Sequence, residues 1–145
     1  MTKPLYMVAV DGSECSDRAT ERAINLAKTN NAKVKLITVM DWSYFPPMVM
    51  EGSAPPLLDK GTEEKNTINR VLTPLIEKYG SSGVELNSEL IWGDPSEEIL
   101  DKVKSEHANM LFVGRQGRSR VIDLLIGSVA NKLAHRIGIP LVLVP

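Results

Sequence analysis

The feature that most constrains the fold is an alternation of short apolar runs with amphipathic segments. The first run, residues 5–10, is continuously apolar and stops at Asp11-Gly12-Ser13. Continuous runs of this kind are typical of strands buried on both faces of a parallel sheet. Between the runs, apolar residues recur at the spacing of an α-helix. We expect strands at residues 5–10, 34–40, 84–90, 110–113 and 139–144, and helices that begin near Ser16, Thr62, Pro95 and Ser128.

Strands that alternate with helices predict an α/β fold with right-handed crossovers. We expect a single-domain, doubly wound, Rossmann-like sheet of five parallel strands with helices on both faces. In residues 84–90 apolar and polar side chains alternate, which favours a place at the sheet edge. A length of 145 residues suits one domain over residues 1–145. Ligands of such sheets bind beyond the carboxyl ends of the strands, where the strand order reverses.

Composition narrows the function classes. The chain has 17 Lys and Arg against 18 Asp and Glu, so we expect no nucleic-acid partner held by bulk charge. Cys15 is the one cysteine, which excludes an intrachain disulfide and a multi-cysteine metal site. We expect no metal site built by the chain alone. No apolar run approaches the ~20 residues that span a membrane, and no targeting segment is visible, so the expected location is cytoplasmic.

Two segments interrupt this regular order. The segment from Asp41 to Gly61 contains four prolines and several large apolar side chains. Prolines resist regular structure, so we expect a long loop that acts as a lid or that covers a sheet edge or partner surface. Pro74 lies inside the helical pattern of residues 62–79 and is expected to kink or divide that helix.

The glycine-rich segment after the fourth strand is the most informative motif. Its spacing is Gly114-x2-Gly117-x9-Gly127-Ser128. It matches neither a Walker A loop nor the dinucleotide-binding fingerprint. Glycines let a ligand approach the backbone, and free N–H groups at a helix start at Ser128 attract anions. We therefore expect a phosphate cradle, with at least one of Arg115, Arg118 and Arg120 neutralising phosphate charge.

These residues together resemble the universal stress protein family, in its nucleotide-binding branch. The resemblance covers essentially the whole chain, through residues 8–13, the Gly93-Asp94-Pro95 turn, the glycine motif and residues 140–144. It implies binding of ATP, ADP or AMP, with or without Mg²⁺. ATP-binding relatives often have a hydroxyl residue where this chain has Ala130. The implied nucleotide-binding residues are Ala9, Val10 and Asp11 at the adenosine, Val39 at adenine, Gly114 at the ribose, and Gly117, Gly127, Ser128 and Val129 at the phosphates, beside Arg115 and Arg118.

The resemblance also implies a role. It indicates a small regulatory module of the stress response, homodimeric through the last strand, Ile139 to Val144, and acting on a protein partner that the sequence does not identify. We assign no catalytic residue and expect at most slow ATP hydrolysis. Two alternatives remain open: a slow ATPase or nucleotidyl-transfer enzyme using the same pocket, and a dimeric interaction module that binds no nucleotide.

Overall fold

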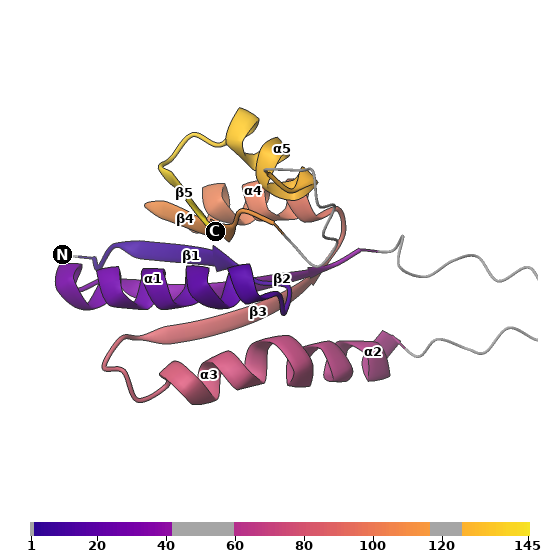
Figure 1. Cartoon of the computed structure of the whole chain (residues 1–145), viewed down its shortest axis with the longest axis horizontal. Helices are drawn as coiled ribbons and strands as arrows, with labels where there is room; N and C mark the ends of the chain where they lie inside the picture. Colours follow the sequence, from indigo (N-terminus) through magenta and orange to yellow (C-terminus); the bar gives the residue numbers. More distant parts are fainter. Residues whose placement is uncertain (1, 42–59, 117–125) are drawn as a thin grey trace, which may run out of the picture.

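Five parallel strands form one sheet in the order β3-β2-β1-β4-β5 (Figure 1). The computed structural model describes residues 2–41, 60–116 and 126–145. β1 is central, and the chain winds outward from it first through β2 and β3 and then through β4 and β5. This confirms the doubly wound α/β fold. The strands are β1 (Leu5–Ala9), β2 (Lys33–Met40), β3 (Leu86–Trp92), β4 (Met110–Gly114) and β5 (Leu141–Val144).

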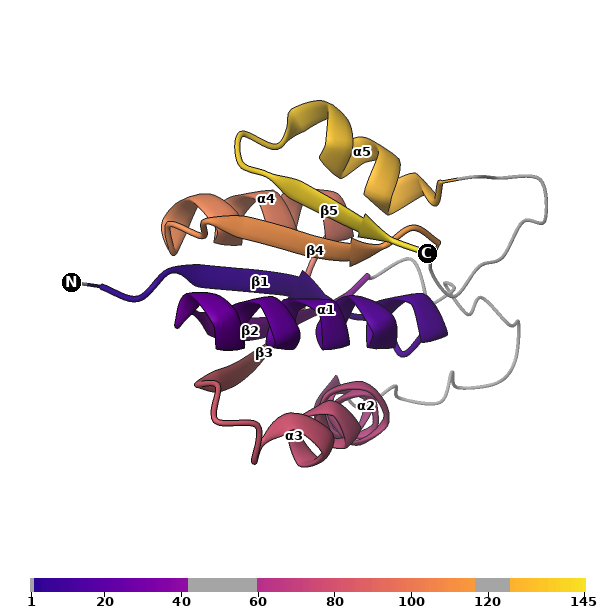
Figure 2. The same cartoon turned by 60° about the vertical axis from the view of Figure 1, so that its left-hand side comes forward.

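Helices cover both faces of the sheet (Figures 1 and 2). On one face the core contains Ala23 and Ile24 of the first helix and Leu75 of the helix Thr73–Tyr79. On the other face it contains Ile99 and Leu133. The helical elements are α1 (Glu14–Asn30), α2 (Lys60–Thr67), the π-helical segment η2 (Ile68–Leu72), α3 (Thr73–Tyr79), α4 (Pro95–Ser105) and α5 (Ser128–Arg136).

The central strand is buried on both faces, as its apolar run predicts. Met7 and Val8 have no exposed surface and belong to the two different core clusters. In the described part of the chain, no helix combines the length and the apolar character needed to cross a membrane.

Both edge strands begin two residues later than expected. β3 begins at Leu86, because the N–H group of Val84 is bonded to the Ser82 hydroxyl within the preceding turn, at 3.2 Å. β5 begins at Leu141, because Pro140 has no N–H group to donate to the ladder. The Pro140 carbonyl still accepts a hydrogen bond from the Leu111 N–H group, at 3.0 Å.

The first helix begins at Glu14, two residues before the expected start near Ser16. Ser13, not Ser16, is the N-cap of α1, and its hydroxyl accepts a hydrogen bond from the Ser16 N–H group at 3.2 Å. Ser16 lies within the first turn, where its own hydroxyl donates to the Ser13 carbonyl at 3.0 Å. The helix therefore begins immediately after the β1–α1 loop, which keeps that loop short.

Pro74 divides the second helical segment, as expected. The wide turn of η2 lies just before it, and the Thr73 N–H group bonds to the Ile68 carbonyl. Because Pro74 has no N–H group and its ring crowds the carbonyl four residues earlier, a regular α-helix cannot continue through it. Lys60 and Gly61, expected in the long loop, instead open α2, while residues 42–59 of that loop lie outside the described part of the chain.

Candidate functional site

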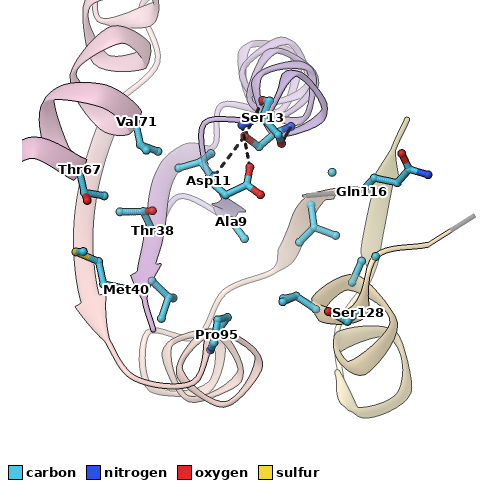
Figure 3. Close-up of a pocket in the computed structure, with 18 of the residues that line it drawn as sticks. Ala9, Asp11, Ser13, Thr38, Met40, Thr67, Val71, Pro95, Gln116 and Ser128 are labelled. Carbon is cyan, nitrogen blue, oxygen red and sulfur yellow. Dashed lines mark hydrogen bonds between the residues drawn. The ribbon is translucent and has the colours of Figure 1, made fainter. Parts of the chain in front are cut away.

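A cavity of about 440 Å³ lies at the carboxyl ends of β1, β2 and β4 (Figure 3). β2 and β4 flank β1, and the chain reverses its direction of winding between them. This is the switch point at which open α/β sheets bind ligands. The cavity volume falls within the range of small-molecule sites.

Most of the residues that the sequence singles out meet in this cavity. Arg115 does not line it, and its side chain is exposed. Gly117, Arg118 and Arg120 lie outside the described residues. The expected residues that line the cavity are Ala9, Val10, Asp11, Val39, Gly114, Gly127, Ser128 and Val129.

Main-chain hydrogen bonds bring the two ends of the glycine motif together. The Arg115 carbonyl accepts a hydrogen bond from the Gly127 N–H group at 2.7 Å. The Arg115 N–H group donates to the Val144 carbonyl at 2.7 Å. Arg115 thus fixes the start of α5 beside the end of β4 through its backbone, which is a different role from the phosphate contact expected of it.

The start of α5 differs from the starts of α1 and α4. Ser13 caps α1 and Asp94 caps α4, each through a hydrogen bond from its side chain to a backbone N–H group. The N-cap of α5 is Gly127, which has no side chain to offer. The first-turn N–H groups and the positive end of the helix dipole are thus presented to the cavity without a side-chain cap, an arrangement that suits an anion.

The cap of α4 is an anchored carboxylate beside the cavity. Hydrogen bonds from the Glu97 N–H group and the Ser96 hydroxyl hold the pKa of Asp94 below its usual value. Pro95 follows as the first helical residue and lines the cavity. The Gly-Asp-Pro turn therefore acts as the helix start that the sequence predicts.

Asp11 is held at the cavity by the β1–α1 loop. Its carboxylate accepts a hydrogen bond from the Ser13 N–H group at 2.9 Å, and its own N–H group donates to the Ser16 hydroxyl at 3.3 Å (Figure 3). Gly12 between them has φ +84°, a conformation that side-chain-bearing residues rarely adopt. The loop thus fixes a hydrogen-bond acceptor at the central strand.

Gly114 is needed for packing as well as for access. A Cβ atom at this position would lie 2.7 Å from the Cβ of Cys15 and 3.0 Å from the Ser16 nitrogen. The sequence suggests that this glycine lets a ligand approach. In the structure it also lets the first turn of α1 lie directly against the end of β4.

One wall of the cavity comes from residues that the sequence did not predict as part of the site. This wall is one side of the α2–η2 helix and contains residues 63, 67, 70 and 71. Their helical spacing would predict a shared side, but only after the helix is placed beside the end of β2. The further lining residues are Ser13, Ser16, Thr38, Met40, Glu63, Thr67, Arg70, Val71, Pro95, Val113, Gln116 and Ala130.

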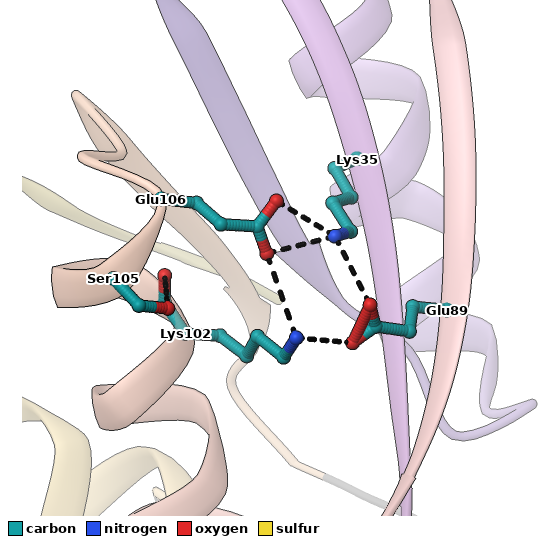
Figure 4. Close-up of polar contacts among 5 residues, drawn as sticks. All are labelled: Lys35, Glu89, Lys102, Ser105 and Glu106. Atoms are coloured by element: carbon teal, nitrogen blue, oxygen red, sulfur yellow. Dashed lines mark hydrogen bonds and ion pairs between the residues drawn. The ribbon is translucent and has the colours of Figure 1, made fainter.

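A second polar cluster lies between β2, β3 and α4 (Figure 4). Lys35 Nζ lies 2.7 Å from Glu106 Oε1 and 3.3 Å from Glu89 Oε1. Lys102 Nζ lies 2.6 Å from Glu89 Oε2. Two ammonium groups and two carboxylates thus compensate one another and tie α4 to the sheet. In the described residues, no group of three or more His, Cys, Asp or Glu side chains could hold a metal ion.

The cluster predicts an acid-sensitive contribution to stability. Burial raises the pKa of Glu89, but hydrogen bonds from Lys102 and Lys35 outweigh it and hold the pKa below its usual value. This contribution is present above the ordinary glutamate pKa of about 4.3 and is lost as the pH falls through the lower folded-state pKa. Glu89→Gln should cost about 0.5–1 kcal/mol at pH 7, and the difference from the parent protein should shrink by pH 3.

Urea unfolding at several pH values measures this effect. Glu85→Gln is the matched control, because Glu85 is exposed just before β3 and has no ion pair among the described residues. A Glu89→Gln penalty that is the same at pH 7 and pH 3 would rule out the ionic contribution.

The fold and the cavity define a class: doubly wound α/β proteins with a ligand site at the switch point. A sequence profile of the universal stress protein family matches residues 6–145. The chain therefore belongs to the universal stress protein family. A universal stress protein of Methanocaldococcus jannaschii is 29% identical over 138 residues, which are 95% of this chain and 79% of the relative.

Solved structures show the same fold. A universal stress protein from Lactobacillus plantarum superposes with a TM-score of 0.76 at 18% identity and full coverage of both chains. A universal stress protein in complex with cAMP has a TM-score of 0.70 at 23% identity, covering 99% of this chain and 98% of the other. One from Archaeoglobus fulgidus in complex with dAMP has a TM-score of 0.67 at 19% identity, with 99% and 98% covered.

Proposed function

We propose that the cavity binds an adenine nucleotide and that the protein is a regulatory module controlled by its occupancy. The observation that carries this proposal is the start of α5, which offers the cavity first-turn N–H groups without a side-chain cap. Two structural neighbours are complexes with the adenine nucleotides cAMP and dAMP, which supports the same ligand class here.

The lining suggests how the nucleotide lies. Its phosphates lie at Gly127, Ser128 and Val129, where the helix dipole favours negative charge. The adenosine extends over the ends of β1 and β2, past Asp11 and Val39. We propose ATP, ADP or AMP as the ligand, with or without Mg²⁺. We assign no general base, so any hydrolysis is slow.

Calorimetry with ATP, ADP and AMP tests this proposal. The protein should bind at least one of them at a single site per chain, and Ser128→Ala should weaken binding modestly by removing one hydroxyl donor. Mass spectrometry of small molecules released from denatured, freshly purified protein would identify a bound nucleotide. No saturable binding and no released nucleotide would contradict the proposal and favour an interaction module.

We also propose that two copies associate through β5. This strand lies at the edge of the sheet, is entirely apolar, and is half-buried at its first three residues. Exposed apolar edges tend to pair with another chain. The carbonyl groups of Pro140 and Val144 accept hydrogen bonds from Leu111 of β4 and from Arg115 just after it. Because successive residues of a strand turn their main-chain groups to opposite edges, those of Leu143 face the free edge.

The oligomeric state can be measured by light scattering. The protein should have twice the mass of its 16.0 kDa chain. Leu143→Pro removes a donor from the free edge while leaving the ladder to β4, so it should give a single-chain mass with unchanged far-ultraviolet circular dichroism. A parent protein with the mass of one chain would refute this interface.

A further inference from the structure

The helical wall of the cavity is fixed in place by β3. The indole Nε1 of Trp92 donates a hydrogen bond to the carboxylate of Glu64, and Lys60 Nζ lies 5.0 Å from the centre of the Trp92 ring. These contacts hold α2 against the end of the sheet. Glu63 and Thr67 lie three and seven residues after Lys60, on the same side of α2, and this side lines the cavity together with Arg70 and Val71 of η2.

This wall lies across the cavity from the proposed phosphate end. Figure 3 shows Thr67 and Val71 on one side and Gln116 and Ser128 on the other, with Thr38 beside the first pair. A ligand anchored at Ser128 by its phosphates therefore directs its other half toward the helical wall.

Arg70 is the one positively charged side chain among the described residues that line the cavity. Its Nη1 atom lies 3.1 Å from the point where a Cβ atom on Gly12 would be. The guanidinium thus lies against the β1–α1 loop, next in the chain to Asp11, in space that exists because residue 12 has no side chain. Arg70 is itself exposed, so it is accessible to a ligand entering from solvent.

The local backbone at Arg70 is unusual. Arg70 is the central residue of η2, and Pro74 ends the α-helical hydrogen bonding just beyond it. Single π-helical turns within α-helices are rare and occur frequently at functional sites. Arg70 thus lies at the centre of the turn that Pro74 imposes, on the part of the helix that lines the cavity.

We propose that Arg70 binds the base of the nucleotide, so that the site favours ligands that carry a base over phosphate chains alone. This inference rests on the proposed function. A guanidinium is planar, donates five N–H hydrogen bonds and stacks on aromatic rings. A purine offers both acceptor ring nitrogens and an aromatic face. Because the proposed phosphate end lies at the opposite wall of the cavity, the base of the nucleotide is the part that reaches Arg70.

Calorimetry with ATP, adenosine and tripolyphosphate tests the assignment. Arg70→Met should weaken ATP and adenosine alike by about tenfold, as expected for the loss of a hydrogen bond from a charged donor, and leave tripolyphosphate unchanged. Arg70→Lys keeps the charge but loses the planar fork, so its effect should be intermediate for ATP and adenosine.

Asn69→Ala is the matched control, because Asn69 is exposed on the same π-helical segment and does not line the cavity. It should leave all three affinities unchanged. An Arg70→Met loss confined to ATP and tripolyphosphate would overturn the assignment by placing Arg70 at the phosphates. Unchanged affinities would also overturn it while leaving the nucleotide site standing. A parent protein that binds none of the three probes would overturn both proposals.

Discussion

Ser128→Asp should stabilise the protein and at the same time sharply weaken its binding of ATP. Ser128 is the first residue of α5, at a helix start without a side-chain cap. A carboxylate there interacts favourably with the helix dipole, which should add about 0.3–1 kcal/mol to the free energy of unfolding. The same carboxylate repels phosphate, because like charges about 4 Å apart interact by several kcal/mol near a protein surface.

We expect ATP affinity to fall by about thirtyfold or more relative to Ser128→Asn, which has nearly the same shape without the charge. Adenosine affinity should be nearly equal in the two variants. Calorimetry gives the affinities and urea unfolding gives the stabilities. If Ser128→Asp and Ser128→Asn bind ATP equally, the phosphates do not lie at α5.

Gly114→Ala should destabilise the fold. The new Cβ atom would lie 2.7 Å from the Cys15 Cβ and 3.0 Å from the Cys15 carbonyl carbon and the Ser16 nitrogen. Because two of these three atoms belong to the backbone of α1, no side-chain rotation relieves the overlap. Overpacking of this kind costs about 1–3 kcal/mol, and we expect the upper part of that range.

Gly138→Ala is the matched control for Gly114→Ala. A Cβ atom at Gly138 would have nothing within 4 Å, and its φ lies outside the region that favours glycine. It should be neutral or slightly stabilising, by about 0.4–1 kcal/mol, because alanine reduces the freedom of the unfolded chain. Urea unfolding of both variants measures the difference. Equal stabilities would show that α1 can move away from β4 at little cost.

Local sequence patterns predict the sheet and the helix starts at its switch point. The apolar run of β1, the Asp94 cap of α4 and the glycine pair before α5 each act within a few residues of the chain. Local chemistry was therefore enough to place them. The start of α1 was predicted near Ser16, whereas the structure has Ser13 as the N-cap.

The helical wall depends on contacts between distant residues. Trp92 and Glu64, whose hydrogen bond holds α2 in place, lie 28 positions apart in the sequence. The Arg70 guanidinium lies against Gly12, which is also distant in the sequence. A local sequence pattern therefore does not predict that this helix lines the cavity. Gly114 also depends on a distant contact, because Cys15 of α1 leaves no room for a side chain at this position of β4. For Arg115 the sequence predicts a phosphate contact of the side chain, whereas in the structure this side chain is exposed and does not line the cavity.

Titration of the ¹⁵N-labelled protein with ATP, followed by nuclear magnetic resonance, would locate the nucleotide directly. We expect the amide signals of Ser128, Val129 and Ala130 at the start of α5, and of Val39 and Met40 at the end of β2, to shift together along one saturable binding curve. Adenosine should shift the β2 signals and leave those of α5 nearly unchanged. Shifts that do not saturate, or that fall outside the residues lining this cavity, would contradict adenine nucleotide binding at the switch point.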